Sequence, residues 1–535
     1  MAVPTRQHAV NGLIRQTISQ RTSPLAGLVL IYAVRRENCG VRERGVGVAE
    51  LTASPAAEPE RSATAQRPLC VDLDGSLVKS DTLVDSLLVL LRTQPALVFK
   101  LPGRLLRGKA AFKAFVTASV TLDAAHLPYN RALLEFLREE HRHGRDLYLA
   151  TGADIHLARR VADHLGIFTG VLASDGSTNL TGNAKLDGLR RQLGSAPFDY
   201  IGNDTPDLPL LAHATQAMVA NPSLGLRMRL ESRGIRPTKT FLERRPLARS
   251  VLKAVRLQQW AKNLLIFVPV LLSHAVTRGK ILTALAAFLC FSLTASSAYV
   301  VNDLLDIEAD RRHAKKRLRP FAAGDLQGVT GVLIAAVLLC AGVAGAQMLP
   351  AGFSAWLLIY LATTLAYSLY LKRIALVDVL VLSGLYILRL LAGSAATLTV
   401  ISHWLASFSM FLFLSLAIVK RFAELENLRA SNSVPKNGRG YMVSDLEQLR
   451  TFGTASAYAA VVVFAIYITG PDVVKLYHAP QLLLLSLPLM ILWLNRVWML
   501  ASRGELDEDP VAFALTDRMS QLIGLAVAVI ALLAL

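Results

Sequence analysis

Apolar residues are distributed unevenly along the chain, and they divide it near residue 253 into two parts. Beyond that point, apolar runs of spanning or near-spanning length follow one another, and about 20 apolar residues cross a bilayer as a helix. The runs lie at about 263–277, 281–301, 328–348, 352–371, 376–396, 403–420, 453–470, 480–500 and 519–535. This pattern predicts an all-α membrane domain of about nine transmembrane helices over residues 253–535.

The connections between these runs alternate in charge. Those after the second, fourth, sixth and eighth runs are rich in Lys and Arg, whereas those after the third and fifth contain neither residue. Basic loops remain on the cytoplasmic side of a membrane. The pattern therefore predicts a multi-pass protein of the inner (cytoplasmic) membrane, with the N-terminal part and the basic loops on the cytoplasmic side.

Residues 67–230 have the shorter apolar stretches of a soluble domain, and three predicted strands in it end at polar side chains. The stretch 68–73 contains Asp72 near its end and is followed by Asp74, and the stretch 145–150 is followed by Thr151. The stretch 199–201 leads into Asp204 and Asp207, and Lys185 lies between the last two strands. Two carboxylates at a strand end suit phosphoryl transfer, because one can attack phosphorus while the other protonates the leaving group.

This order of motifs resembles the haloacid dehalogenase-like (HAD) phosphohydrolase superfamily over roughly residues 67–225. The resemblance implies a doubly wound parallel sheet whose ligands bind at the strand C-termini, with a small helical cap over about residues 80–143. It implies that Asp72 is the nucleophile and Asp74 the general acid/base, and that Thr151 and Lys185 bind the phosphoryl group. It further implies that Asp72, Asp204 and Asp207 are the Mg²⁺ ligands. A degenerate domain kept as a scaffold is the alternative.

The two segments that flank this domain contain no motif of candidate catalytic residues. Residues 1–66 have no sustained period and predict a disordered tail, and residues 231–252 predict a basic linker interrupted by Pro237 and Pro246. The four cysteines have no metal-ligand spacing and predict no disulfide framework.

The densest charge in the membrane domain lies at residues 302–324, directly after the second apolar run. Asp303, Asp306 and Asp310 are spaced to share one face of a helix, where a divalent cation would relieve their mutual repulsion. A cationic run follows at residues 311–319. Carboxylates beside such a run suit a substrate that carries a diphosphate. A solvated charged loop is the alternative.

The NDxxDxxxD motif on a multi-helix membrane domain resembles the UbiA-type prenyltransferase superfamily. The segments QWAKN, YSLYLK, LRLLAG, KRFAEL and DPVAFALTDR narrow the resemblance to its decaprenyl-phosphate phosphoribosyltransferase branch. It implies a polyprenyl phosphate acceptor, a phosphoribosyl diphosphate donor, and Mg²⁺ held by Asp303, Asp306 and Asp310 as catalytic residues. The substrate-binding residues that we expect in this domain are Lys262, Asn302, Arg317, Arg319, Tyr367, Lys372, Arg389 and Lys420.

Two other functions compete with this interpretation. A prenyltransferase with an aromatic acceptor is disfavoured because KRFAELE stands where a second Asp-rich motif is expected. A transporter or scaffold is disfavoured because Asp72, Asp74 and the three aspartates of the membrane motif are all present. The net charge of +18 fits basic loops and anionic lipid or phosphate substrates, so we expect no nucleic-acid partner. The expected role of the HAD domain is removal of the 5-phosphate from the phosphoribosyl lipid.

Overall fold

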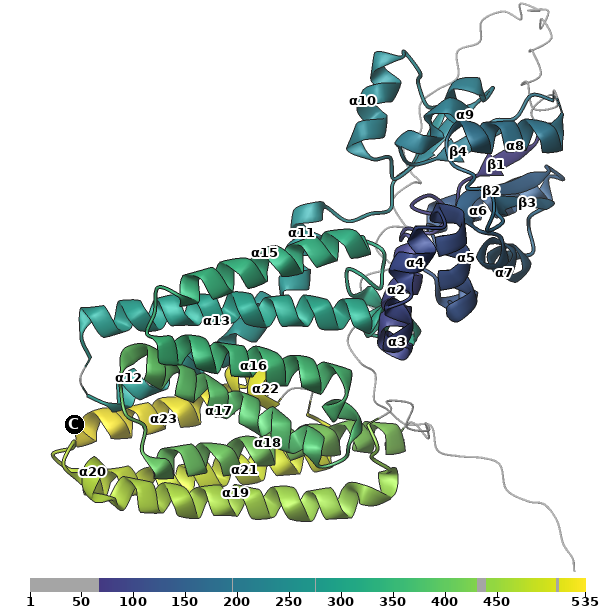
Figure 1. Ribbon diagram of the computed structural model, residues 1–535. Coiled ribbons are helices and arrows are strands. Elements are labelled where there is room, and N and C mark those ends of the chain that lie inside the picture. The colour runs from purple at the N-terminus through teal and green to yellow at the C-terminus, as the bar shows by residue number, and fades with distance from the viewer. Residues whose placement is uncertain (1–66, 195, 275, 431–438, 507–509) are drawn as a thin grey trace, which may run out of the picture. The chain divides into compact units, whose positions relative to one another are not determined.

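The computed structural model describes residues 67–194, 196–274, 276–430, 439–506 and 510–535. The predicted disordered tail, residues 1–66, lies outside the described residues. The described chain forms an α/β domain followed by a helical domain of apolar helices (Figure 1). The predicted fold class, a doubly wound parallel sheet followed by an all-α membrane domain, is confirmed.

The α/β domain is built on one six-stranded sheet with the order β3-β2-β1-β4-β5-β6, and every pair of neighbours is parallel. The strands are β1 (Leu69–Val71), β2 (Leu147–Asp154), β3 (Gly170–Ser174), β4 (Asp199–Gly202), β5 (Ala217–Ala220) and β6 (Lys239–Phe241). This order places the C-terminal ends of β1, β2 and β4 beside one another at the centre of the sheet, where ligands bind in such folds. Strand β6 lies in the stretch predicted as a basic linker, so the sheet extends further along the chain than the sequence indicated.

Side chains of the central strands alternate between two apolar cores, as the pleat requires. Leu69 and Val71 of β1 belong to one core, and Cys70 between them belongs to the core on the other face of the sheet. All three are fully buried. This burial fixes β1, and with it the position of Asp72 at its end.

Helices cover the sheet and form a cap between β1 and β2. The cap helices are α2 (Thr82–Thr93), α3 (Pro95–Val98), α4 (Leu101–Leu105) and α5 (Lys109–Ser119). The remaining helices of this domain are α6 (Arg131–Arg142), α7 (Ile155–Leu165), α8 (Asn183–Leu193), α9 (Leu208–His213) and α10 (Leu224–Ser232). The predicted helical cap therefore has its counterpart in α2–α5.

Within the described residues, seven helices are long and apolar enough to cross a membrane. They are α13 (Arg278–Leu305), α15 (Gly328–Ala346), α16 (Ala351–Leu369), α17 (Val377–Thr397), α18 (His403–Ala430), α19 (Leu446–Thr469) and α21 (Ser486–Ser502). With the 3₁₀ segments that precede them, the last two extend over Val443–Thr469 and Pro480–Ser502. The shorter helices of this part are α11 (Leu247–Val255), α12 (Val268–Leu272), α14 (Ile307–Arg312), α20 (Pro471–Val474), α22 (Pro510–Thr516) and α23 (Arg518–Ala534). The long helices and α23 match eight of the nine predicted runs.

The first predicted run does not form a spanning helix. Its residues belong to a 3₁₀ segment, η3 (Leu257–Phe267), followed by the short helix α12. Pro269 disfavours a continuous α-helix here, because proline lacks a backbone N–H and restricts the residue before it. The segment instead packs closely on α17, where a Cβ added to Gly393 would lie 2.2 Å from the carbonyl oxygen of Ile266.

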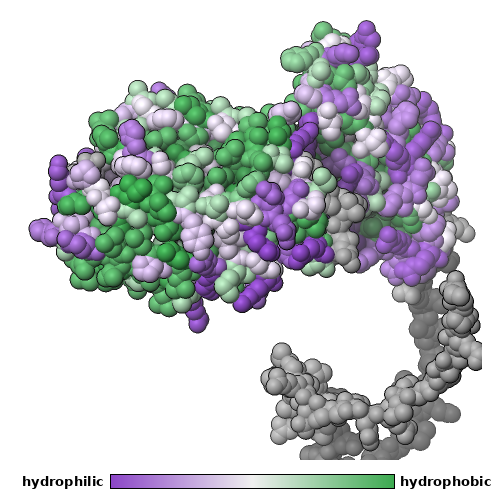
Figure 2. All heavy atoms as spheres, turned by 90° about the horizontal axis from the view of Figure 1, so that it is seen from below, coloured by the Kyte–Doolittle hydropathy of each residue, from purple (hydrophilic) through white to green (hydrophobic). Residues whose placement is uncertain are grey.

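Large apolar side chains remain exposed on the outside of the helical domain. Val329, Val332, Leu333 and Val337 of α15 are each more than half exposed, and Figure 2 shows apolar residues spread over the surface of this domain. Soluble proteins rarely expose continuous apolar surface of this extent, whereas lipid tails cover it in a membrane. The chain is therefore a multi-pass membrane protein.

Candidate active sites

In the α/β domain, the predicted catalytic carboxylate and lysine lie in direct contact. Asp72 follows β1, and its Oδ1 is 2.8 Å from Nζ of Lys185, which projects from α8. The same Nζ lies 2.9 Å from Asp207 Oδ1 and 3.0 Å from the hydroxyl of Tyr200. All four side chains are buried. Lys185 therefore holds two carboxylates together at the strand ends, and its predicted role in binding the phosphoryl group remains a prediction.

The turn after Asp72 places Asp74 beside the first residue of the cap. Gly75 has φ +78°, and a Cβ added to it would lie 2.0 Å from the side chain of Asn203, so the turn requires glycine. The backbone N–H of Thr82, at the start of α2, donates to Asp74 Oδ1 at 2.8 Å. Asp81 caps the same helix by accepting from the N–H groups of Leu83 and Val84.

The protonation behaviour of this cluster suits acid/base chemistry. Burial raises the pKa of Asp72 to about 7, although Lys185 opposes the shift. Burial, with the nearby charges of Asp81 and Asp72, raises the pKa of Asp74 to about 8. Burial alone would lower the pKa of Lys185, but the two carboxylates outweigh it and raise that pKa. A protonated Asp74 beside a charge-paired Asp72 is what a general acid next to a nucleophile requires.

The remaining predicted residues of this site differ in their surroundings. Thr151 is fully buried in β2, where its Oγ1 accepts from the N–H of Ala153. Asp207 uses Oδ1 for Lys185 and Tyr200 and Oδ2 for the N–H of Asn203. Asp204 is exposed and accepts from Ser223 Oγ at 2.6 Å. Metal binding by Asp72, Asp204 and Asp207 remains a prediction, and Asp207 is already engaged through both oxygens.

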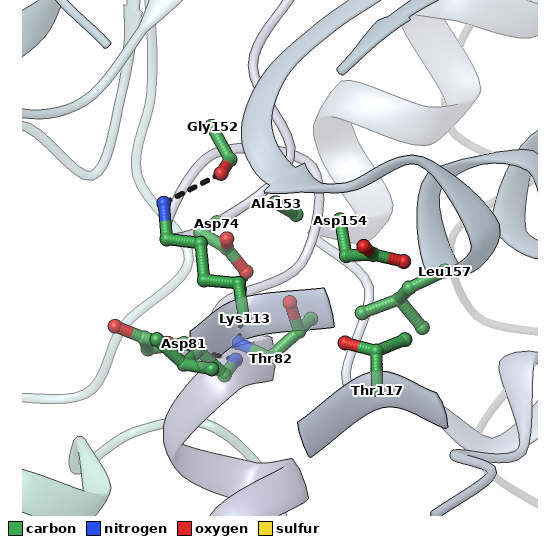
Figure 3. A pocket seen from close by; sticks show the side chains of 10 residues that line it. Asp74, Asp81, Thr82, Lys113, Thr117, Gly152, Ala153, Asp154 and Leu157 are labelled. Atoms are coloured by element: carbon green, nitrogen blue, oxygen red, sulfur yellow. Dashed lines mark hydrogen bonds between the residues drawn. The ribbon is translucent and has the colours of Figure 1, made fainter. Parts of the chain in front are cut away.

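A small cavity of about 80 Å³ lies between the cap and the strand ends. Asp74, Asp81 and Lys113 line it, together with Gly152 and Asp154 after the second motif (Figure 3). Lys113 comes from α5 of the cap, and its Nζ donates to Gly152 O at 2.7 Å and to Asn179 Oδ1 at 2.8 Å. Lys113 could not be found from the sequence, because no motif surrounds it.

In the helical domain, the three aspartates of the motif do not lie on one continuous helix as expected. Helix α13 ends at Leu305 and α14 begins at Ile307, with Asp306 at the junction. Like charges three and four residues apart destabilise a helix, which accounts for a break at this point. Asp303 and Asp310 still meet, because Nη1 of Arg319 lies 3.0 Å from Asp303 Oδ1 and 2.7 Å from Asp310 Oδ2.

Asp306 has different partners from the other two carboxylates. Nζ of Lys372 lies 3.2 Å from Asp306 Oδ2 and 3.5 Å from Asn302 Oδ1. Nη1 of Arg92, a residue of the cap helix α2, lies 2.7 Å from Asp306 Oδ1. Arg256 is a second cation on Asp303. Four cations thus contact the three carboxylates, and they include the predicted residues Arg319 and Lys372.

The aspartates suit a magnesium ion by their chemistry and by one observation. Within the described part of the chain, no three Asp, Glu, His or Cys side chains gather closely enough to hold a metal by themselves. Mg²⁺ is usually bound by one or two carboxylates completed by substrate phosphates and water. Asp303 and Asp310 already converge on one cationic nitrogen of Arg319. Their oxygens are therefore placed to share a positive charge, and the donor set fits the ion.

The other predicted substrate-binding residues are not all at this cluster. Arg389 is buried, where its Nε donates to Asn263 Oδ1 at 2.8 Å and its guanidinium lies about 5 Å from the rings of Tyr360, Phe291 and Tyr386. Tyr367 accepts from Arg421 at 3.1 Å. Arg317 is exposed on the 3₁₀ turn η4 (Lys316–Leu318), whereas Lys262 on η3 and Lys420 on α18 are half-buried. The binding roles of these residues remain predictions.

Two cations at the aspartates were not found from the sequence. Arg92 and Arg256 lie far from the motif along the chain, and neither is part of a recognisable pattern. The structure does mark Arg256 in one way: its backbone, between α11 and η3, is left-handed with φ +55°. Non-glycine residues adopt that conformation at a cost, and such strain concentrates at functional sites.

Comparisons with known proteins match both parts of the chain. The model of the UbiA prenyltransferase family matches residues 264–521. The uncharacterized protein y4nM of Sinorhizobium fredii (strain NBRC 101917 / NGR234) is 36% identical over 86% of this chain and 90% of its own length. The decaprenyl-phosphate phosphoribosyltransferase of Mycobacterium tuberculosis (strain ATCC 25618 / H37Rv) is 34% identical over 52% of this chain and 92% of its own length. A solved HAD family hydrolase from Salmonella enterica serovar Typhi has 15% identity over 31% of this chain and 65% of that chain, with a TM-score of 0.24.

Proposed function

This chain belongs to the UbiA prenyltransferase family, and we propose that its helical domain transfers 5-phosphoribose from phosphoribosyl diphosphate to a polyprenyl phosphate. The observation that carries the proposal is the contact of Arg92, Arg256, Arg319 and Lys372 with the three aspartates of the motif. Four cations against three carboxylates leave excess positive charge, which suits a donor rich in phosphate. The similarity to a decaprenyl-phosphate phosphoribosyltransferase supports the choice of donor and acceptor.

In the proposed reaction, an oxygen of the lipid phosphate bonds to the anomeric carbon of the donor. The bond from that carbon to the diphosphate oxygen breaks, and diphosphate leaves with the electron pair. Arg319 and Lys372 are positioned to bind its oxygens. Asp303 and Asp310, which converge on Arg319, would hold Mg²⁺, with Asp306 beside them, and the ion when bound would neutralise charge on the leaving group. The lipid tail would lie in an apolar groove between helices.

We further propose that the HAD-like domain is a phosphatase that removes the 5-phosphate from the product lipid. The Asp72 carboxylate would attack phosphorus and form an aspartyl-phosphate, while Asp74 gives its proton to the departing ribose oxygen. Water would then hydrolyse the aspartyl-phosphate and release inorganic phosphate. Lys185, 2.8 Å from Asp72, would balance negative charge on the phosphoryl group. Both sites would face the cytoplasm, and the positive charge of the basic loops supports this orientation.

The test uses purified full-length protein with radiolabelled phosphoribosyl diphosphate, polyprenyl phosphate and Mg²⁺, followed by lipid extraction and chromatography. Wild type is expected to give ribosyl lipid, Asp72→Asn to stop at phosphoribosyl lipid, and Asp303→Ala to give neither. Asp146→Asn alters an exposed carboxylate of the α/β domain and should behave as wild type. Failure of label to enter lipid, with consumption of a prenyl diphosphate by an aromatic acceptor, would overturn the transferase proposal.

A further inference from the structure

The cap helix α2 connects the two candidate active sites. At its N-terminal end, the N–H of Thr82 donates to Asp74, the proposed general acid. In its last turn, Arg92 contacts Asp306 of the aspartate motif through Nη1, and the same nitrogen donates to the carbonyl oxygen of Leu305 at 3.2 Å. One helix of the HAD-like domain thus reaches the carboxylates of the transferase site.

A buried ion pair fixes α2 against the helical domain. Arg311, directly after the motif, places Nη2 2.7 Å from Asp85 Oδ2 and 3.0 Å from Ser80 Oγ. The side chains of Arg311 and Asp85 are 3% and 1% exposed. A charge withdrawn from water in this way is strongly destabilising without its partner. The pair therefore specifies where α2 lies along α14.

Apolar packing supports the same placement of α2. A Cβ added to Gly328, at the start of α15, would lie 2.7 Å from Cγ1 of Val84. Leu88 packs against a core of the helical domain that contains Leu304 and Ile307. These residues flank Asp306 in sequence, so the packing surface and the Arg92 contact belong to one interface. Arg92 is consequently held at the motif by its helix as well as by its own ion pair.

The charges around Asp306 indicate that Arg92 has a role besides pairing with this carboxylate. Lys372 already contacts Asp306 at 3.2 Å, so this carboxylate has one cation without Arg92. The side chain of Arg92 is 27% exposed, and both of its described contacts go through Nη1. The planar guanidinium fork carries five N–H donors, which match the oxygens of phosphate. The residue is therefore able to hold Asp306 and a phosphate oxygen together.

We propose that Arg92 is a donor-binding residue of the transferase site, supplied by the HAD-like domain. Its ligand is a phosphate group of the phosphoribosyl diphosphate donor, so the inference rests on the proposed transferase function. The cap of the HAD-like domain is then part of the transferase site, and the helical domain alone holds an incomplete donor site.

The test compares full-length Arg92→Gln, Arg92→Lys and wild type for binding of radiolabelled phosphoribosyl diphosphate with Mg²⁺. It also measures KM for the donor and for polyprenyl phosphate. A charge-assisted hydrogen bond lost from a site weakens binding about tenfold or more. Arg92→Gln should therefore raise Kd and KM for the donor at least tenfold and leave KM for the lipid within about twofold. Arg92→Lys should recover part of the loss.

The matched control is Asp123→Asn. Asp123 belongs to the same domain and pairs with Arg312 at 3.3 Å, so its loss removes a contact between the domains that does not reach the aspartates. It should leave donor binding unchanged. Equal donor affinity in wild type and Arg92→Gln would overturn the inference while the proposed function stands, as would a loss of folding in Arg92→Gln that Arg92→Lys shares. If wild type itself does not bind the donor, the proposed function fails, and the inference fails with it.

Discussion

Arg421 and Asp378 form an ion pair inside the helical domain, with Arg421 Nε 2.6 Å from Asp378 Oδ2 and side-chain exposures of 2% and 0%. Tyr441 donates to the same carboxylate at 3.0 Å, and Arg421 also donates to Glu424 at 2.8 Å. The pair joins α17 to α18. Every partner in this network is already satisfied within the protein, which is characteristic of a structural role.

Arg421→Met should therefore destabilise the helical domain strongly. It leaves the Asp378 carboxylate buried without its cation, at a cost of about 3–5 kcal/mol. Thermal unfolding of the detergent-solubilised protein measures the effect. Arg429→Met is the matched control on the same helix, because the Arg429 side chain is 58% exposed, and we expect it to cost less than about 1 kcal/mol. Equal melting of the two variants would contradict a structural role for the pair.

Lys185→Met should abolish the phosphatase activity proposed for the α/β domain. Without the ammonium group, Asp72 and Asp207 repel each other, and the phosphoryl group loses its cation. Removal of one such donor typically lowers kcat about 100- to 1,000-fold. The rate of phosphate release from a small phosphate ester tests this. Lys100→Met, at an exposed position of the cap, should retain wild-type rates, and similar rates in both variants would show that Lys185 has no catalytic role.

Lys113 should affect substrate binding by the same domain more than turnover. Its ammonium group lines the cavity beside Asp74 but contacts Gly152 and Asn179 rather than Asp72. We expect Lys113→Met to raise KM for phosphate esters about tenfold with a smaller change in kcat, since one charged hydrogen bond is worth about 1.5–3 kcal/mol. Lys109→Met, on the exposed side of the same helix, is the control. A drop in kcat with KM unchanged would place Lys113 in the chemical step instead.

Donor and Mg²⁺ together should stabilise the helical domain. A ligand present at about 100 times its Kd adds about 2.7 kcal/mol to the free energy of unfolding. The rise in Tm should vanish on chelation with EDTA and in the double variant Asp303→Asn, Asp310→Asn, which removes the carboxylates that share Arg319. Glu447→Gln, at an exposed position of α19, should keep the rise. An undiminished rise in the double variant would show that these aspartates do not hold the metal.

The sequence predicted contacts best where the order of the elements along the chain determines which residues meet in the fold. Asp72, Lys185 and Asp207 could be predicted to meet, because the ends of neighbouring parallel strands lie at one edge of a sheet. The apolar runs located the spanning helices, because each run must satisfy its own backbone within the bilayer. The break at Asp306 escaped prediction, because the spacing of the aspartates fits a helix while their repulsion opposes one.

Contacts between distant segments were beyond sequence reasoning. Nothing in the surroundings of Arg92 or Arg256 distinguishes them from the other arginines of a chain with 57 basic residues. Arg389 lies inside an apolar run, where a guanidinium needs an anion or a water-filled cavity, and its expected substrate-binding role remains a prediction. The structure gives this side chain partners within the protein. Those partners, Asn263 and three aromatic rings, could not be identified without the fold.

Helix α2 would couple the timing of the two proposed reactions. Its twelve residues form a rod about 18 Å long, and its ends cannot move independently over that length. A shift of the helix along its own axis that draws the Thr82 amide away from Asp74 would also displace Arg92 from Asp306. If the cap opened to admit or release a phosphorylated lipid, Arg92 would bind the diphosphate donor less tightly. The two active sites would then be occupied in turn, because one rigid helix contributes to both.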